Sequence, residues 1–340
     1  MTQADNQLID PDGRNIHYLR VSVTDRCNYR CTYCMPEDGV DHTARADVLS
    51  FEEITALVSA FAGLGVRRVR LTGGEPTVRK DLVTLAGMLA ALPGIEDLAL
   101  STNGHRLAEL AAPLRAAGVT RLNVSLDSLR PERFAKITRR GQVADVLAGL
   151  AAAKAVGFAS IKLNAVAIKG FNDDEVAALC TFAWQHGFVP RFIEQMPMME
   201  GALFVPGQLM SAADVRAALL ADFPGAALVP EPEARLGAGP ARYWRLEGGN
   251  HDGICRLGLI TPITEHFCDT CNRVRLSSSG SLHTCLAHDN AVDLRRALHD
   301  GGSAAVQAAI LAALALKPPS HLFTLGAKGG PRKSMVQIGG

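Results

Sequence analysis

Three cysteines near the start of the chain have the spacing of ligands to one metal centre. Three residues separate Cys27 from Cys31, and two separate Cys31 from Cys34, so one short loop can direct three thiolates to one point. A four-iron cubane has four corners, and cysteine thiolates are its usual ligands. Three cysteines therefore predict a cluster with one iron open to another molecule. Structural zinc takes four protein ligands, and the nearest histidines, His17 and His42, lie outside this loop.

A second group of three cysteines lies further along the chain. Two residues separate Cys268 from Cys271, and Cys285 follows after thirteen more. The turn signal at 278–281 predicts a hairpin with Arg275 and Leu282 on opposite arms, which would return Cys285 to the other two cysteines. We expect a second open cluster here. Zinc is an alternative on spacing alone, and its fourth ligand could be His266, His283 or His288.

Polar residues follow the strands that we predict, at the carboxyl ends where parallel sheets carry ligand sites. After the second strand come Gly73, Gly74 and Glu75; paired glycines allow close approach of a ligand, and a carboxylate can accept hydrogen bonds from an ammonium group. Arg273 and Arg275 share one face of a strand, and guanidinium groups suit phosphate. Further polar residues at strand ends are Ser101, Asn103, Asn123, Ser125, Lys162, Asn164 and Gln195. Together they predict a ligand pocket.

The elements that must position these residues alternate between strand and helix. We expect strands at 18–24, 69–72, 98–102, 122–126, 161–168 and 191–196. Helices are expected at 50–64, 81–92, 106–117, 131–137, 143–156 and 173–186. Six consecutive strand–helix units predict a parallel sheet with right-handed crossovers. A partial barrel and an open doubly wound sheet both fit this pattern.

The pattern changes near residue 200, where we place a domain boundary between 1–200 and 201–340. Proline and glycine become frequent at 224–239, short strands are expected at 243–246 and 256–260, and a last helix is expected at 303–316. Cys180 lies in a helical pattern and is expected in the core. Cys255 receives no role from the sequence.

Composition narrows the class of protein. The chain has 340 residues, 48% of them hydrophobic, and a net charge of +1 with dispersed lysines and arginines. Nothing suggests a partner in nucleic acid. The start is polar and lacks the apolar core of a signal peptide, and the apolar run at 304–316 is too short to span a bilayer. We expect a cytoplasmic protein with no membrane contact, in which six of the eight cysteines bind metal and no disulfide framework forms.

The first triplet, with Tyr33 before its last cysteine, resembles the signature of radical S-adenosylmethionine (SAM) enzymes. The run Cys-Asn-Arg-Val-Arg-Leu at 271–276 and the terminal Gly339-Gly340 make the resemblance closer. From Arg20 onwards the chain resembles the GTP 3′,8-cyclase family of molybdenum-cofactor biosynthesis. This implies an α/β fold, a partial (βα)6 radical SAM barrel with a C-terminal auxiliary iron–sulfur cluster domain.

The resemblance also implies an activity. A lyase of this family converts GTP to (8S)-3′,8-cyclo-7,8-dihydroguanosine 5′-triphosphate, the first step of molybdopterin synthesis. A 5′-deoxyadenosyl radical takes the hydrogen from C3′ of the ribose, and C3′ then attacks C8 of guanine.

Roles of individual residues follow from the resemblance. One [4Fe-4S] cluster would bind SAM and be held by Cys27, Cys31 and Cys34. A second, auxiliary [4Fe-4S] cluster would bind guanine and be held by Cys268, Cys271 and Cys285. Contacts to SAM would come from Tyr33, Gly74, Ser125 and Met196. The GTP site would be lined by Arg20, Arg70, Ser101, Lys162, Arg273, Val274 and Arg275. Catalytic roles would belong to Arg20, Gly339 and Gly340, and the terminal glycines would enter the active site.

The implied partners are an electron donor of the flavodoxin or ferredoxin type, a downstream cyclic pyranopterin monophosphate synthase and a second copy of the chain in a homodimer.

Two alternatives stand beside this interpretation. Another radical SAM enzyme, such as one that modifies peptides, would usually carry more cysteines after the barrel than Cys255 and the second triplet. A zinc-stabilised binding protein is the other alternative, and metal analysis would separate it from an iron–sulfur enzyme.

Overall fold

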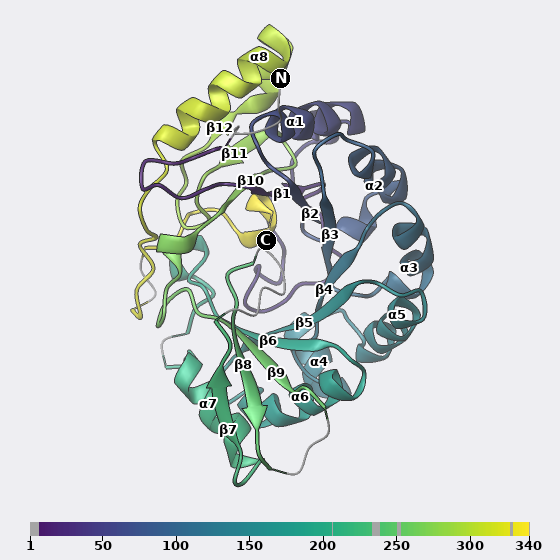
Figure 1. Ribbon diagram of the computed structural model, residues 1–340, viewed down its shortest axis with the longest axis vertical. Helices are drawn as coiled ribbons and strands as arrows, with labels where there is room; N and C mark the ends of the chain where they lie inside the picture. Colours follow the sequence, from purple (N-terminus) through teal and green to yellow (C-terminus); the bar gives the residue numbers. More distant parts are fainter. Residues whose placement is uncertain (1–6, 206, 233–238, 250–252, 327–328, 340) are drawn as a thin grey trace.

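A curved sheet surrounds a central space, and helices cover its outer side (Figure 1). The computed structural model describes residues 7–205, 207–232, 239–249, 253–326 and 329–339. Six parallel strands lie side by side in chain order. They are β1 (Tyr18–Ser22), β2 (Arg68–Thr72), β3 (Asp97–Thr102), β4 (Arg121–Ser125), β5 (Ser160–Ala167) and β6 (Val189–Glu194). The parallel sheet of a partial barrel is confirmed.

The helices that connect these strands also match the sequence prediction, with ends that differ by a few residues. They are α1 (Phe51–Gly63), α2 (Leu82–Ala90), α3 (Leu107–Ala116), α4 (Pro131–Thr138), α5 (Val143–Ala155) and α6 (Val176–Gln185). The start of α1 shows why its position could be predicted from the sequence. The Ser50 hydroxyl accepts from the Glu53 amide, and the Glu53 carboxylate accepts from the Ser50 amide, which forms a capping box.

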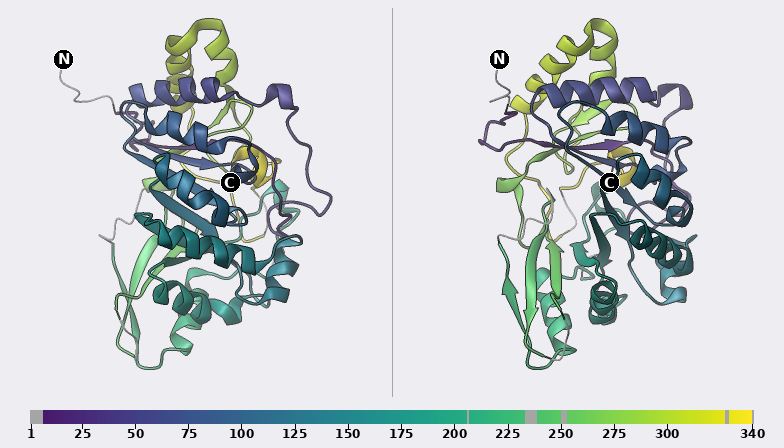
Figure 2. Two further views of the ribbon diagram at one scale, coloured as in Figure 1. Left: turned by 90° about the vertical axis from the view of Figure 1, so that its right-hand side faces the viewer. Right: turned by 45° about the vertical axis from the view of Figure 1, so that its right-hand side comes forward.

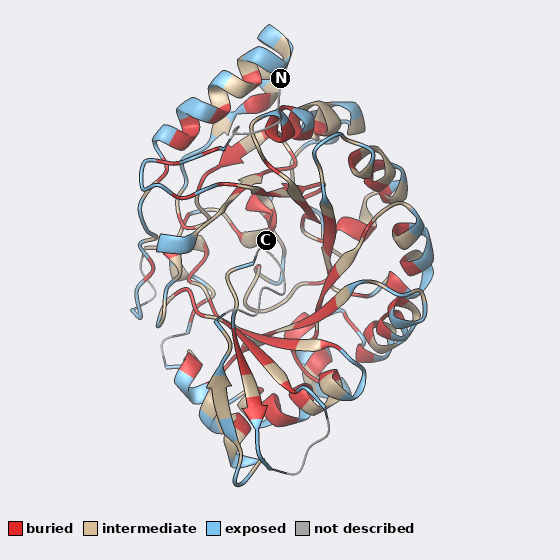
Figure 3. Cartoon of the chain, viewed as in Figure 1, coloured by how far each residue is buried: buried red, intermediate tan, exposed pale blue. Residues whose placement is uncertain are grey.

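The two faces of the strands differ in chemistry. On β1, Leu19 and Val21 are fully buried in the main core, whereas Tyr18 and Arg20 line the central cavity. The period of two in a strand sends successive side chains to opposite faces. Figure 3 shows the strands largely buried, with exposed residues on the outer sides of the helices. The core therefore lies between sheet and helices, and Cys180 is part of it as expected.

Residues after 200 extend the same sheet at both edges. At one edge β10 (Arg273–Leu276) pairs in parallel with β1, followed by β11 (Ser281–His283) and β12 (Val292–Asp293). At the other edge β9 (Arg256–Ile260) pairs in parallel with β6, followed by β8 (Arg242–Glu247) and β7 (Ala227–Pro230). The hairpin of β10 and β11 is confirmed, since Leu276 pairs with Leu282. The division at residue 200 stays a prediction.

Three helices complete the described chain: α7 (Ala212–Ala221), α8 (Leu294–Ala315) and α9 (Met335–Ile338). The expected helix at 303–316 is confirmed as the second part of α8, and a first part that starts at Leu294 precedes it; Gly301 and Gly302, whose φ and ψ are not helical, form a kink between the two parts. Short 3₁₀ turns lie at Arg45–Asp47, Pro76–Val78, Asp173–Glu175, Met199–Gly201 and Cys268–Thr270. Among the described helices, none has the length and apolar character needed to cross a membrane. Figures 1 and 2 place α9 inside the curve of the sheet.

Candidate active site

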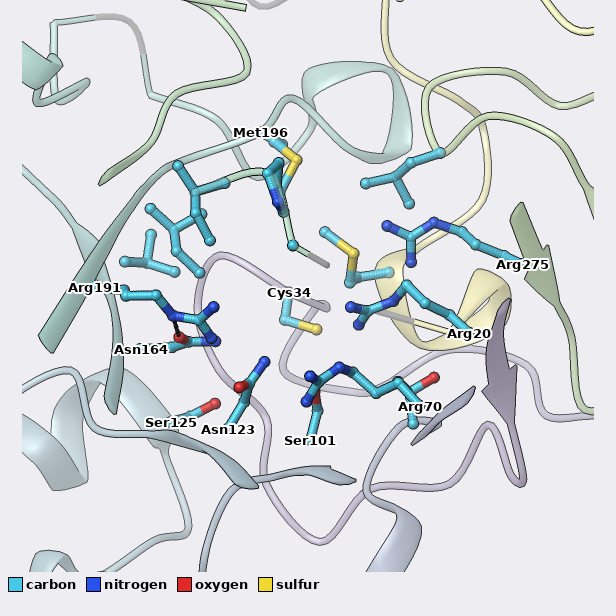
Figure 4. A pocket seen from close by; sticks show the side chains of 18 of the residues that line it. Arg20, Cys34, Arg70, Ser101, Asn123, Ser125, Asn164, Arg191, Met196 and Arg275 are labelled. Atoms are coloured by element: carbon cyan, nitrogen blue, oxygen red, sulfur yellow. Dashed lines mark hydrogen bonds between the residues drawn. The ribbon is translucent and has the colours of Figure 1, made fainter. Parts of the chain in front are cut away.

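The concave side of the sheet encloses a cavity of about 360 Å³, within the range of small-molecule sites. Both cysteine triplets contribute to its wall, together with the ends of the parallel strands. All predicted site residues that the structure describes line it, with the exceptions of Val274 and Gly339. Figure 4 shows side chains from several strands pointing into one space around Cys34. The candidate residues chosen from the sequence therefore surround one cavity, whose geometry comes from the sheet.

The first triplet lies on the loop after β1. The amides of Cys34 and Met35 donate to the carbonyl of Cys31, at 2.9 and 3.2 Å, and so form a tight turn. Burial, together with neighbouring negative charge, raises the pKa of the Cys27 thiol to about 11 and that of Cys34 to about 12. These thiols hold their protons until a metal displaces them, so cluster loading must release protons.

No three histidine, cysteine, aspartate or glutamate side chains within the described ranges converge as ligands of one metal ion. The donor set of the first triplet still fits an iron–sulfur cluster in kind, since it consists of three thiols on one wall of the cavity.

Gly73 and Gly74 pack directly against the cysteine loop. The Gly74 amide donates to the Thr24 carbonyl at 2.7 Å, and the Glu75 amide donates to the Arg26 carbonyl at 2.8 Å. A Cβ atom at Gly74 would overlap that Arg26 oxygen, so a side chain there would push the two segments apart. The pair of glycines thus holds the backbone of β2 against the cluster loop.

Glu75 has hydrogen-bond donors inside the protein. Its carboxylate accepts hydrogen bonds from the Thr77 amide at 3.0 Å, the Thr102 hydroxyl at 2.7 Å and the Asn103 amide at 2.6 Å. These bonds tie the end of β2 to the end of β3. The sequence treated Glu75 as available to an ammonium group, whereas the structure gives its carboxylate to the protein's own donors.

Asp127 is a second buried carboxyl beside the first triplet. It accepts a hydrogen bond from the Tyr33 hydroxyl at 2.9 Å and one from the Val166 amide at 2.8 Å. Burial raises the pKa of Asp127 to about 6 in spite of these bonds. The contact fixes Tyr33, the aromatic residue that precedes Cys34.

Three arginines stand in register on neighbouring strands. Arg20 of β1 pairs with Arg275 of β10 on one side and with Arg70 of β2 on the other. Figure 4 shows the three guanidinium groups pointing into the cavity. Arg70 is oriented by donating Nε to the Tyr18 hydroxyl and Nη1 to the Leu100 carbonyl. Burial lowers the pKa of Arg20 to about 10.

A further cationic group lies across the cavity. Arg191 of β6 donates Nε to Asn164 Oδ1 at 2.9 Å, and it pairs with Gly258 of β9. A Cβ at Gly258 would lie 2.7 Å from Arg191 Cγ, so this glycine leaves room for the arginine. Lys162 of β5 also lines the cavity, and burial lowers its pKa to about 6. The sequence missed Arg191; the available signal was its alternation with Phe192 on a predicted strand.

Acidic groups on the wall have partners elsewhere in the protein. Asp97 pairs with Arg121, and Glu194 accepts from the Ile263 and Thr264 amides. In the described chain, no carboxylate forms an ion pair with Arg70, Arg191, Arg273 or Arg275, and Arg191 Nη2 and Arg273 Nε are buried without a hydrogen-bond partner. The cavity is therefore suited to a ligand with several negative charges.

The second triplet reaches the cavity through the β10–β11 hairpin. Cys268 lies in a 3₁₀ turn, Cys271 precedes β10, and Cys285 follows β11. Burial alone would raise the pKa of Cys271, but the charges of Arg273 and Lys317 lower it below its usual value. For Cys285, burial raises the pKa. The burial pattern on β10 alternates, so Arg273 and Arg275 line the cavity while Val274 packs in the main core.

The end of the chain lies beside the arginines. Arg275 Nη1 donates to the Gly339 carbonyl at 2.6 Å, and Met335 and Val336 of α9 line the cavity. Gly339 has a φ of 84°, and a Cβ there would lie 2.8 Å from Ser22 Cβ. Glycine is thus required twice, by backbone conformation and by space. Gly340, the other terminal glycine of the prediction, lies outside the described residues.

Comparison with known proteins agrees with this arrangement. Residues 21–183 match the family described as the radical SAM superfamily, and residues 189–323 match the family described as Molybdenum Cofactor Synthesis C. A GTP 3′,8-cyclase from Ectopseudomonas mendocina is 48% identical over 98% of this chain and 99% of its own length. One from Pelotomaculum thermopropionicum is 45% identical over 97% of this chain and 99% of its own.

A solved structure shares the fold. Streptococcus suis SuiB bound to the precursor peptide SuiA superposes with a TM-score of 0.57 at 15% identity, covering 80% of this chain and 60% of that one. At that identity the likeness concerns the fold alone.

Proposed function

Since the chain belongs to the GTP 3′,8-cyclase family within the radical SAM superfamily, we propose that it converts GTP to (8S)-3′,8-cyclo-7,8-dihydroguanosine 5′-triphosphate, the first step of molybdenum-cofactor biosynthesis. One observation carries the proposal. A single cavity is lined by both cysteine triplets and by a group of buried cations. Those are the parts needed to bind a radical-generating cofactor and a nucleoside triphosphate side by side.

As a radical SAM enzyme the protein uses an iron–sulfur cluster and SAM. When bound, these supply a 5′-deoxyadenosyl radical that takes the hydrogen from C3′ of the GTP ribose. We assign the cluster to Cys27, Cys31 and Cys34, because their thiols share one loop and one wall of the cavity. Gly74 holds the neighbouring backbone close to that loop. Tyr33, Ser125 and Met196 line the same cavity and are proposed to contact SAM.

We assign the auxiliary [4Fe-4S] cluster, and with it the guanine of GTP, to Cys268, Cys271 and Cys285. The support is chemical: three thiols border the cavity, and cations surround Cys271. Placement of the base there would direct the ribose and the phosphates toward the strands, where the cations lie.

The triphosphate is proposed to bind the cations that point into the cavity. Arg273 and Arg191 carry buried N–H groups without a protein partner, which a phosphate oxygen would satisfy. The remaining proposed GTP contacts are Arg20, Arg70, Ser101, Lys162 and Arg275, all on the wall, together with the backbone of Val274. Charge-assisted hydrogen bonds to phosphate contribute about 1.5–3 kcal/mol each. The chain's work is to orient two ligands and to exclude water from the reacting carbon.

The C-terminal tail is proposed to complete the site. Gly339 lies beside Arg275, one of the proposed GTP contacts, and Gly340 is the next residue in the sequence. A carboxylate and backbone amides without side chains can approach a ligand there. Arg20 is in register with Arg275 and would have its catalytic role in the same part of the site.

Further parts of the proposal rest on the family. We infer a barrel domain at 1–200 and an auxiliary-cluster domain at 201–340, with the second closing the open side of the first. Each turnover needs two electrons, one to cleave SAM and one, with a proton, to complete the cyclised nucleotide, and a flavodoxin- or ferredoxin-type donor is their proposed source. A cyclic pyranopterin monophosphate synthase would take the product, and the chain is proposed to act in the cytoplasm as a homodimer.

Anaerobic reconstitution with iron and sulfide, followed by incubation with SAM, GTP and dithionite, tests the proposal. Replacing Cys27, Cys31 and Cys34 by alanine should leave one cluster and abolish SAM cleavage. Replacing the second triplet should also leave one cluster, keep SAM binding and remove productive GTP binding. Cys180→Ala, a buried core substitution outside both triplets, is the matched control and should keep both clusters. Full iron content in either triple variant would show that the ligand assignment is wrong.

A further inference from the structure

Lys317 lies at the second cysteine triplet although it is distant from it in sequence. It is 4% exposed and lies just beyond α8, where its amide donates to the Leu314 carbonyl at 2.9 Å. Pro318 and Pro319 follow and end the helix, since proline has no amide proton and restricts the residue before it. The position of the lysine is therefore fixed by the end of a helix and not by a mobile loop.

The ammonium group of Lys317 joins the two segments that carry the auxiliary cysteines. Its Nζ donates to Cys271 Sγ at 3.7 Å and to the Thr284 carbonyl at 2.5 Å. Thr284 is the residue directly before Cys285. One buried cation thus contacts the sulfur of one proposed ligand and the backbone next to another.

Arg14 fixes the same turn from its other side. Its guanidinium donates to the Pro318 carbonyl at 3.0 Å and the Pro319 carbonyl at 2.7 Å, and also to the Cys268 carbonyl at 3.1 Å. Asp10 accepts from Arg14 Nε at 2.6 Å and holds the guanidinium in place. All three cysteine segments are consequently connected to the Lys317–Pro319 turn.

We propose that Lys317 is a positioning residue for the auxiliary cluster, which sets its reduction potential through the hydrogen bond to Cys271 and holds Cys271 and Cys285 at their mutual spacing. The inference rests on the proposed second cluster. Potentials of iron–sulfur clusters respond to net charge, to hydrogen bonds on the sulfurs and to solvent exposure. One-electron reduction adds negative charge to the cluster, so a buried ammonium group at a ligand sulfur stabilises the reduced form more than the oxidised form.

The test uses the full-length chain with the first triplet replaced by alanine, so that the auxiliary cluster is the one that is measured. Iron and sulfide are counted first, and the cluster is then titrated with dithionite at controlled potential and followed by electron paramagnetic resonance. In Lys317→Met and Lys317→Gln the one-electron equilibrium should move at least tenfold toward the oxidised form. This corresponds to a reduction potential that is more negative by about 59 mV. Lys317→Arg keeps the charge and should recover most of that shift.

Lys154→Met is the matched control, because Lys154 is an exposed residue of α5, and it should leave the potential unchanged. Loss of the cluster in Lys317→Met with its return in Lys317→Arg also supports the positioning role. An unchanged potential in both Lys317→Gln and Lys317→Met overturns this inference alone. A parent chain that takes up no iron at the second triplet overturns the proposed function, and this inference with it.

Discussion

Lys162 gives the proposed GTP site a pH dependence that can be measured directly. The side chain is 4% exposed, and burial followed by the charges of Arg191, Arg70 and Arg121 lowers its pKa to about 6. At neutral pH the free protein therefore holds mainly the neutral amine. A bound triphosphate favours the ammonium form, so GTP binding should take up a proton from the solvent.

The size of the effect follows from the difference between the pKa and the pH. At about pH 8, some two units above the free-state value, nearly one proton should be taken up per GTP, and the affinity should fall about tenfold per further unit. Calorimetric titration in buffers of different ionisation enthalpy counts this proton. In Lys162→Met the uptake should vanish, and affinity near pH 6 should fall roughly tenfold or more, because a charged hydrogen bond of about 1.5–3 kcal/mol is lost. In Lys162→Arg the new side chain is always charged, so this variant should bind GTP without taking up a proton.

The same lysine affects the stability of the free protein. The unfolded chain holds this proton up to the ordinary value of 10.5, whereas the folded chain releases it near 6, so the unfolded state binds more protons between these values. The free energy of unfolding should therefore rise with pH across this window, by up to about 1.4 kcal/mol per unit from this group. Lys162→Met should flatten that slope. Native protein that binds GTP at about pH 8 without proton uptake would refute the reasoning, since Lys162 would then already be charged.

Substitutions elsewhere separate the two halves of the cavity. Gly74→Ala should abolish SAM binding in equilibrium dialysis, because its Cβ would overlap the Arg26 carbonyl. The control is Gly87→Ala in α2, where a Cβ has open space; it should keep SAM binding and raise the free energy of unfolding by up to about 1 kcal/mol. Native SAM affinity in Gly74→Ala would contradict the packing argument. Arg191→Met should weaken GTP binding roughly tenfold or more at unchanged SAM affinity, and equal losses of both ligands would indicate a folding defect instead. Removing the two terminal glycines, or adding a C-terminal tag, should leave folding, clusters and most GTP affinity intact but stop formation of the cyclic product; a truncated chain that works at the full-length rate would show the tail to be passive.

The sequence predicted those parts of the fold and site that depend on local pattern. The six strand–helix units, the β10–β11 hairpin and the polar strand ends all follow from periodicity, turn residues and capping boxes such as the one at Ser50. The two triplets were visible because the cysteines of each lie close together in the sequence.

Other features depend on contacts between distant segments, which periodicity does not encode. Arg191 faces the cavity beside Gly258 of β9, a strand paired with β6 only in the folded sheet. Lys317 meets partners 46 and 33 residues away. Glu75 looked like a free carboxylate because its donors on and after β3 lie about one strand–helix unit further on. The first part of α8, from Leu294, was missed because the non-helical Gly301 and Gly302 separate it from the part that follows.

The arrangement of charge explains how one fold can hold such a site. Like charges in register, as Arg275, Arg20 and Arg70 are, repel one another and oppose folding. The opposite face of the same strand contributes Leu19 and Val21 to the main core, and burial of apolar surface there stabilises the sheet. Because alternation separates the two faces, the inward residues can change while the outward residues maintain the barrel. SuiB shares the fold at 15% identity. In this chain the proposed function is therefore assigned to the inner face of the sheet, and the proposals for Lys317 and for the C-terminus add to it.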